Sequence, residues 1–226
     1  MADLIEVVDV FVDEQGRHGN PLGILWSSPQ TRKREQEIAR DAGFSETIFI
    51  DRIADGSAHA RIFTPVQELP FAGHPTVGLA AWLLASGDDI RTISLPAGSA
   101  RVRQDGDLVY ITALPQWAPE FSLQRLDSPA DVEAIDPDAY SVGLHYVWAW
   151  ISREDRTVRA RMFAPELGVR EDEATGSAAV RLSAELGHDL DILQGAGSRL
   201  YTHVRYLGQQ VEVGGRTSPS RMLQLN

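Results

Sequence analysis

The sequence contains no cysteine and only one lysine, Lys33. Without cysteine the chain forms no disulfide and no thiolate metal site, and it cannot use a two-thiol racemase mechanism. Lys33 lies in the charged stretch 31–37, which is typical of a solvated helix face, whereas a pyridoxal enzyme needs a lysine in its pocket. The six histidines form no HExxH or other compact ligand set. We therefore expect no metal and no organic cofactor.

Long apolar runs and an excess of positive charge are also absent. No stretch approaches the roughly 18 apolar residues of a membrane helix, and the N-terminus lacks the basic and apolar segments of an export signal. The net charge of −11 over 226 residues argues against nucleic acid or an anionic membrane as the main partner, because both select basic surfaces. The sequence predicts a cytoplasmic protein.

Residues 61–76 read RIFTPVQELPFAGHPT and run directly into the apolar segment 77–85. This pattern predicts a strand, a loop and a helix that Pro75 opens and Gly87 ends. Gly73 would let a ligand approach the backbone, and the free N–H groups of the first helical turn would bind a carboxylate or phosphate. We expect His74 on the rim of this anion site.

A second copy of the pattern follows, because RMFAP at 161–165 repeats the R-x-F-x-P of 61–65, and Gly187 repeats Gly87. Its loop is about three residues longer and its helix correspondingly shorter, so Ser177 takes the place of His74. Two copies indicate two similar lobes.

We place the two lobes at residues 1–116 and 117–226, with the last strand returning to the first lobe. Their helix starts, 73–76 and 175–178, should face one cleft and bind one small anion.

The remaining elements follow from periodicity and from glycine and proline positions. Strands are predicted at 4–11, 22–26, 44–50, 90–95, 99–104, 108–112, 142–151, 199–206, 209–213 and 221–225, helices at 31–42 and 178–186, a helix-compatible stretch at 127–137, a linker at 114–119 and a turn at Gly214-Gly215.

Glu46 stands out because the period of a strand over 44–50 places it on one face with Phe44, Ile48 and Ile50. Desolvation among apolar groups disfavours a charged carboxylate, which suits a group that both gives and takes protons. The alternative is a structural carboxylate paired with an arginine or capping a backbone N–H.

Two further polar residues carry two interpretations each. Asp172 lies in the acidic run 171–173 before the second helix, where acids either stabilise the helix start or aim a carboxylate at a substrate. Asn20 precedes Pro21, so its amide either braces the turn or faces a ligand.

Five blocks together resemble a known family. They are Val10-Phe11 with Gly19-Asn20-Pro21, Ser45-Glu46-Thr47, Phe71 to Thr76, Arg161 to Pro165 and Glu171 to Ser177. In this order and spacing they resemble the PhzF-like phenazine-biosynthesis isomerases of the diaminopimelate-epimerase-like fold. The resemblance implies an α+β protein of two pseudo-symmetric lobes, each a strongly curved, mostly antiparallel sheet or barrel around a central helix. It also implies an active site between the lobes and a homodimer.

Carried over by position, Glu46 resembles the family's general acid/base, and His74 and Asp172 resemble its flanking polar residues. The substrate-binding positions would be Asn20, Gly73, Gly176 and Ser177. The resemblance implies an isomerase without metal or cofactor, which moves a proton within a small unsaturated carboxylic or amino acid of secondary metabolism.

Two departures from the family pattern concern the second lobe. The chain is short between about Leu126 and Val142, and Glu173 stands where proline is common. Two other functions therefore stay open. One is a non-catalytic homodimeric binding module, and the other is a two-base epimerase that uses Glu46 and Asp172.

Overall fold

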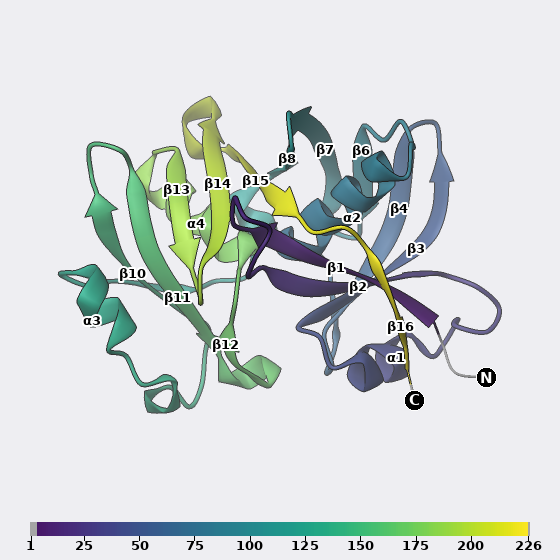
Figure 1. Cartoon of the computed structure of the whole chain (residues 1–226), viewed down its shortest axis with the longest axis horizontal. Coiled ribbons are helices and arrows are strands. Elements are labelled where there is room, and N and C mark those ends of the chain that lie inside the picture. The colour runs from purple at the N-terminus through teal and green to yellow at the C-terminus, as the bar shows by residue number, and fades with distance from the viewer. Residues whose placement is uncertain (1–3, 226) are drawn as a thin grey trace.

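The computed structural model describes residues 4–225, which form two lobes side by side (Figure 1). The first lobe contains β1 (Leu4–Val12), β2 (Asn20–Trp26), α1 (Glu35–Ala42), β3 (Glu46–Ala54), β4 (Ser57–Phe63), β5 (Glu68–Leu69), α2 (Gly73–Ala85), β6 (Thr92–Leu95), β7 (Gly98–Asp105) and β8 (Leu108–Ala113). The second contains β9 (Ser122–Arg125), α3 (Pro129–Glu133), β10 (His145–Ser152), β11 (Thr157–Ala164), β12 (Val169–Asp172), α4 (Gly176–Leu186), β13 (Leu190–Gln194), β14 (Ser198–Arg205), β15 (Gln210–Thr217) and β16 (Arg221–Gln224).

The two lobes repeat the same strand pairings. In the first, β2 is parallel to β3 and β4 to β6, while β3–β4, β4–β5, β6–β7 and β7–β8 are antiparallel. In the second, β9 is parallel to β10 and β11 to β13, while β10–β11, β11–β12, β13–β14 and β14–β15 are antiparallel. A parallel pair needs a crossover connection, and α1 to α4 supply the four crossovers. This confirms the α+β class and the pseudo-symmetric lobes.

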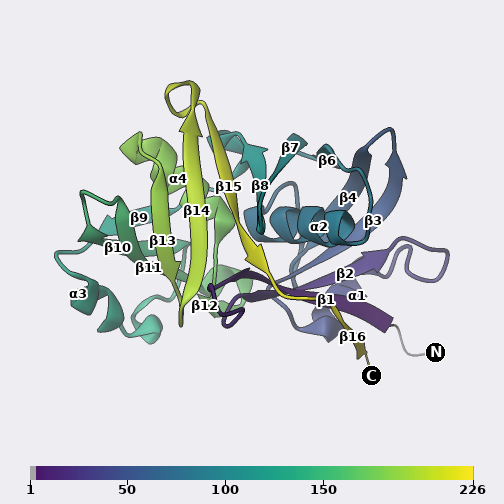
Figure 2. The ribbon, with the colours of Figure 1, turned by 45° about the horizontal axis from the view of Figure 1, so that its top comes forward.

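A single path of strands joins the lobes, because β15 pairs with β14 on one side and with β8 on the other. Figure 2 shows β15 running between the lobes toward β1, with which it also pairs. The last strand, β16, pairs with β1. The exact boundary between the lobes, at residue 116, stays a prediction.

Helices α2 and α4 lie inside the curved sheets, whereas α1 and α3 lie outside. Helix α2 is apolar around its whole circumference, which is typical of a buried helix, and all but three of its 13 residues are buried. The main apolar core surrounds α2 and α4, and two smaller cores lie beneath α1 and α3. The starts of α2 and α4 are thus surrounded by the main apolar core.

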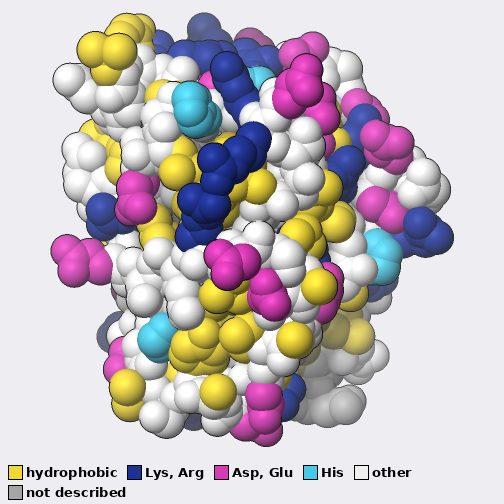
Figure 3. Space-filling view, turned by 90° about the vertical axis from the view of Figure 1, so that its left-hand side faces the viewer, with side chains coloured by type: hydrophobic (Ala, Val, Ile, Leu, Met, Phe, Trp, Pro, Cys, Tyr) yellow, Lys and Arg dark blue, Asp and Glu magenta, His cyan; other side chains and the backbone are white. Residues whose placement is uncertain are grey.

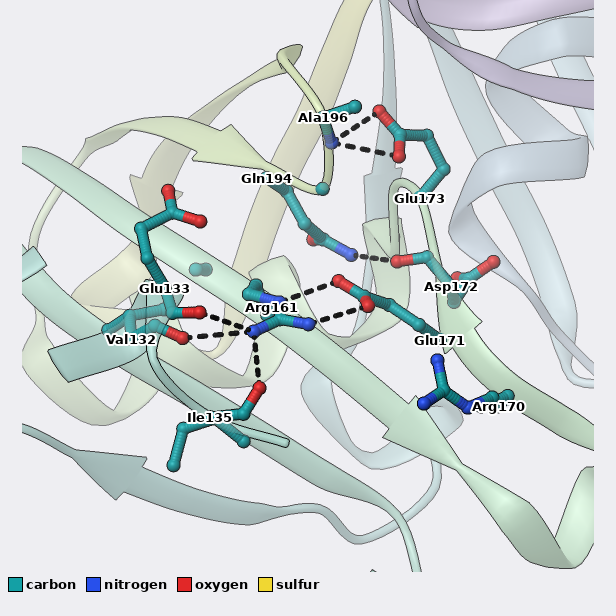
Figure 4. Close-up of polar contacts among 12 residues, drawn as sticks. Val132, Glu133, Ile135, Arg161, Arg170, Glu171, Asp172, Glu173, Gln194 and Ala196 are labelled. Atoms are coloured by element: carbon teal, nitrogen blue, oxygen red, sulfur yellow. Dashed lines mark hydrogen bonds and ion pairs between the residues drawn. The ribbon is translucent and has the colours of Figure 1, made fainter. Parts of the chain in front are cut away.

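The repeated arginines hold the outer helices. Arg61 on β4 donates to Glu35 of α1 and lies over the Phe63 ring, at 5.6 Å from its centroid. Arg161 on β11 donates to three backbone carbonyls at the end of α3 and to Glu171, and lies over Phe163 (Figure 4). The repeated R-x-F-x-P pattern therefore has a structural role in both lobes.

The outer face of the second lobe, around α3, carries charges of both signs. In Figure 3 a line of basic side chains crosses this face, with acidic side chains and apolar patches beside it. Within residues 4–225 no helix is long and apolar enough to span a membrane.

Strand β3 separates two cores, and here one prediction was wrong. Ile48 and Ile50 face the main core, while Phe49 faces the core beneath α1. Phe44 packs on the α1 core as well, so it does not share a face with Glu46. The strand begins at Glu46, so its period of two does not extend back to Phe44.

Several element boundaries also differ from the prediction. Helix α1 begins at Glu35 and not at residue 31, because Lys33 has a left-handed φ of 68°. Helix α2 begins at Gly73, two residues before Pro75. Strand β13 was missed, although Gly187, which ends the second helix in a left-handed conformation, marks a turn just before residues 190–194.

The predicted turn at Gly214-Gly215 was wrong, since both glycines lie inside β15. A Cβ on Gly214 would come within 2.3 Å of the Val109 carbonyl oxygen, and one on Gly215 would lie 2.7 Å from Phe11. These glycines allow neighbouring chain segments to approach closely where β15 joins the lobes.

Candidate active site

The helices α2 and α4 begin against each other at the junction of the lobes. A Cβ on Gly73 would lie 2.7 Å from the Gly176 carbonyl carbon, and one on Gly176 would lie 3.0 Å from that of Gly73. Only glycine allows this approach of the two backbones. The two helix starts thus meet at one place, as the predicted arrangement requires, and the positive ends of both helix dipoles lie there together. That they bind one anion stays a prediction.

A cavity of about 340 Å³ opens beside this junction and draws its walls from both lobes. Its lining includes two residues with carboxyl groups, Glu46 and Asp172, and three with hydroxyl groups, Ser45, Thr175 and Ser177. Apolar walls come from Leu69, Phe71, Trp117, Phe121, Leu144 and Met162. Within the described part of the chain no lysine or arginine lines the cavity. It has the size and mixed lining of a site for a small organic molecule.

Glu46 is the first residue of β3, and its carboxyl group is bound to His74 at the start of α2. The distance between Glu46 Oε2 and His74 Nδ1 is 3.0 Å, and His74 Nε2 lies 3.0 Å from the carbonyl oxygen of Asn20. A carbonyl only accepts, so Nε2 carries a proton. Nδ1 and Oε2 then share one further proton, held either as imidazolium with carboxylate or as imidazole with carboxylic acid. Glu46 is thus coupled directly to a second proton-binding group.

Asp172 ends β12 and lies on the other wall of the cavity. Its Oδ1 accepts from Asn20 Nδ2 at 2.7 Å, and its Oδ2 accepts from the Thr175 hydroxyl at 2.6 Å. Asn20 also donates to the carbonyl of Ala174, and its own amide oxygen accepts from Ser45. Asn20 therefore links β2 of the first lobe to the loop before α4 of the second.

Burial raises the pKa of Asp172 to about 7, and the negative charge of Glu46 adds to the rise. The hydrogen bonds from Thr175 and Asn20 and the nearby His74 oppose it. Near neutral pH Asp172 therefore exchanges a proton readily, which suits a group in general acid/base chemistry.

The predicted site residues lie together, at different depths. Glu46, Asp172 and Ser177 line the cavity, whereas Asn20, Gly73 and Gly176 lie behind its lining. His74 is only 2% exposed and lies beneath Glu46, so its predicted place on the rim was wrong. An imidazole with both nitrogens bound is more stable in the interior than on a rim.

The three acids of the run 171–173 have three different environments (Figure 4). Glu171 is paired with Arg161, away from the cavity. Glu173 accepts from the Ala196 N–H and the Ser198 hydroxyl, both at 2.9 Å. Only Asp172 lines the cavity.

Sequence reasoning missed two residues. Trp117 lies in the predicted linker but forms a cavity wall, with its ring 5.7 Å from that of Phe71. An aromatic residue between the prolines of an interlobe segment was the available signal. Gln194, on the missed strand β13, binds Asp172 and Thr175 from behind, and no sequence motif marks it.

The sequence model of the PhzC-PhzF family, described as phenazine biosynthesis-like protein, matches residues 8–139 and 126–213. The chain belongs to this family. It is 34% identical to the trans-2,3-dihydro-3-hydroxyanthranilate isomerase of Pseudomonas aeruginosa over 92% of this chain and 94% of the relative. It is 31% identical to the enzyme of the same name from Pseudomonas chlororaphis, over 84% of each chain. As a PhzF-type protein it is an isomerase.

Solved structures support the fold assignment. The PhzF-family protein of Enterococcus faecalis aligns with a TM-score of 0.77 at 22% identity over 99% of each chain. A hydroxyproline epimerase from Agrobacterium vitis aligns with a TM-score of 0.58 at 15% identity, over 98% of this chain and 93% of the other. The PhzF-like protein thus has the expected diaminopimelate-epimerase-like fold. The two matches to the family model overlap at 126–139, inside the stretch that is short in this chain.

Proposed function

We propose that this protein moves a proton within a small unsaturated carboxylic or amino acid, with Glu46 as the general acid/base and without a cofactor. The observation that carries the proposal is the hydrogen bond between Glu46 and His74 at the wall of a cavity that also holds Asp172. No other hydrogen bond to the Glu46 carboxyl group is found within residues 4–225. One oxygen is therefore held by His74 and the other is left for substrate.

In the proposed reaction the Glu46 carboxylate removes a proton from a carbon next to a double bond. The electron pair moves through the allylic system, and a proton is returned to a distant carbon of the same molecule. The C–H bond that breaks is replaced by the C–H bond that forms, so the substrate is neither oxidised nor reduced. One acid/base contributes roughly 10²- to 10⁴-fold in rate, so the substrate must itself be activated.

A substrate carboxylate is matched to the two helix starts. Because no arginine or lysine of the described chain lines the cavity, the N–H groups and dipoles at the starts of α2 and α4 are the available positive potential. The same groups stabilise the negative charge that builds up during proton removal.

The relatives that act on trans-2,3-dihydro-3-hydroxyanthranilate, as their names state, suggest a cyclic diene acid as the first substrate to assay. Conversion would be followed by the change in ultraviolet absorbance, with Glu46→Gln as the inactive comparison. Turnover by wild type that persists unchanged in Glu46→Gln would refute the proposed role of Glu46.

The two-base epimerase is the second candidate, favoured by the presence of Glu46 and Asp172 in one cavity. Stereochemical analysis of the product separates a positional shift from inversion. The expected homodimer stays a prediction, which light scattering of the purified protein would test.

A further inference from the structure

Gln194, the last residue of β13, is completely buried behind Asp172 and Thr175. Its amide nitrogen donates to the backbone carbonyl of Asp172 at 3.0 Å and to Thr175 Oγ1 at 2.8 Å. Its amide oxygen accepts from the Thr175 N–H at 3.2 Å and from the Tyr146 hydroxyl at 3.1 Å. Figure 4 shows the amide pointing toward Asp172.

The orientation of this amide is fixed by its partners. The Asp172 carbonyl can only accept, so it faces the Gln194 nitrogen, and the Thr175 N–H can only donate, so it faces the oxygen. Burial raises the pKa of Tyr146, which keeps its phenol protonated and able to donate. In a flipped Gln194 the amide nitrogen would face the Thr175 N–H, which is also a donor, and the amide oxygen would face the Asp172 carbonyl, which is also an acceptor.

This orientation also fixes the direction of the Thr175 hydroxyl. Because Thr175 Oγ1 accepts from the Gln194 nitrogen, its own proton points to Asp172 Oδ2, which lies 2.6 Å away. Asn20 donates to the other oxygen, Oδ1. Each oxygen of Asp172 therefore receives one hydrogen bond, and both bonds favour the charged carboxylate over the acid.

We propose that Gln194 is a positioning residue that holds the Thr175 hydroxyl toward Asp172 and thereby sets the pH at which Asp172 releases its proton. The other ionisable groups that face Asp172 are Glu46 from β3, His74 from α2 and Tyr146 from β10, and of these, within residues 4–225, only Tyr146 has a hydrogen bond to Gln194. The catalytic meaning of this device rests on the proposed function, but the proton affinity itself can be measured without substrate.

The test compares urea unfolding from pH 4 to pH 9 in proteins with and without Asp172→Asn. The stability difference between these two proteins changes with pH until native Asp172 has lost its proton, and it is constant at higher pH. The pH at which this difference becomes constant therefore reports the native proton affinity of Asp172. It is measured in three backgrounds, which are wild type, Gln194→Met and Tyr146→Phe. Gln194→Met removes all hydrogen bonds of the Gln194 side-chain amide. Tyr146→Phe is the matched control, because it removes the one buried hydrogen bond from Tyr146 to Gln194 and leaves the hydrogen bonds of Gln194 with Asp172 and Thr175 intact.

Gln194→Met is expected to move the levelling-off point upward by about one pH unit, a tenfold rise in proton affinity. Tyr146→Phe is expected to leave it in place. An unchanged point in Gln194→Met overturns the proposal, and so does an equal shift in both variants, which would indicate general loosening of the core.

Thr175→Val gives a second route if Gln194→Met does not fold. It removes the hydroxyl and keeps Gln194, so it should produce the same upward shift, and an unchanged point would again overturn the proposal. With substrate, the pH profile of kcat/KM should move by the same amount. If the variants show the expected pH shifts but the wild type has no turnover, the proposed function alone is refuted.

Discussion

Gly73 and Gly176 begin the two central helices in direct backbone contact, with 2.7 Å between a Cβ built on Gly73 and the Gly176 carbonyl carbon. This contact is the point where the pseudo-symmetric lobes meet, and Glu46 and Asp172 lie in the cavity beside it. The geometry of the site therefore depends on how closely two backbones approach.

Gly73→Ala should both destabilise the protein and lower its turnover. The added methyl group meets the backbone of α4, which cannot rotate away, and such overpacking costs about 1–3 kcal/mol. Gly78→Ala in the same helix is the control, because the three atoms nearest to its methyl group belong to the side chains of Leu22, Val10 and Val8 and not to backbone. Thermal unfolding of both variants checks this, and equal melting temperatures would contradict it.

Glu46→Gln should remove turnover, by at least about 100-fold, and preserve the fold. Glutamine can donate an amide N–H to His74 Nδ1, so the histidine keeps both of its bonds, but it cannot carry a proton. In deuterated water the wild type should place deuterium at the carbon that receives the proton, and Glu46→Gln should not. Glu171→Gln, in which the altered acid faces Arg161, should remain active.

Asp172→Asn should gain stability relative to wild type as the pH rises. The native carboxyl keeps its proton up to about pH 7, whereas the ordinary value is 3.8, so between these values the native state binds more protons than the unfolded chain. Wild-type stability attributable to Asp172 is therefore lost as the pH rises through this window. The pH-dependent part of the stability difference between Asp172→Asn and wild type is at most about 4 kcal/mol, and it is constant above pH 7.

Urea unfolding between pH 4 and pH 8 measures this difference. Asp138→Asn is the control, because the Asp138 carboxyl lies at the surface and Arg170 lowers its pKa. A stability difference for Asp172→Asn that does not change with pH would show that the buried carboxyl ionises normally.

Small carboxylates such as benzoate should bind more tightly at pH 6 than at pH 8. The cavity lining holds two acids and, within residues 4–225, no lysine or arginine, so ionisation of Asp172 adds a negative charge beside the ligand. A repulsion of about 1.4 kcal/mol between the ligand carboxylate and ionised Asp172 corresponds to a tenfold loss of affinity from pH 6 to pH 8, which calorimetry should show. In Asp172→Asn this pH dependence should largely vanish.

Lys33→Ala should leave turnover and absorbance spectrum unchanged. Lys33 is exposed in the turn before α1 and does not line the cavity, so it cannot form a Schiff base with a bound ligand. A folded Lys33→Ala protein without activity would contradict the proposed cofactor-free mechanism.

The sequence by itself determined the repeat and the residues that flank the cavity. The R-x-F-x-P pattern, Gly73 and Gly176 predicted two equivalent helix starts, because short-range rules of backbone conformation and helix capping govern those positions. Glu46 was singled out because a carboxyl group on the apolar face of a strand is unusual. Asp172 was singled out because its acidic run lies beside a predicted anion-binding helix start, and the family resemblance favoured its role in the site.

Only the tertiary structure decided which groups contact one another. The bonds from His74 to Glu46, from Asn20 to Asp172 and from Gln194 to Thr175 join residues that are 28, 152 and 19 positions apart. Their partners depend on strand register and on the approach of the lobes, and no local pattern encodes either. Gly214-Gly215 shows the same limit, because locally it predicts a turn, but the crowding of β15 by Val109 and Phe11 makes it part of a strand.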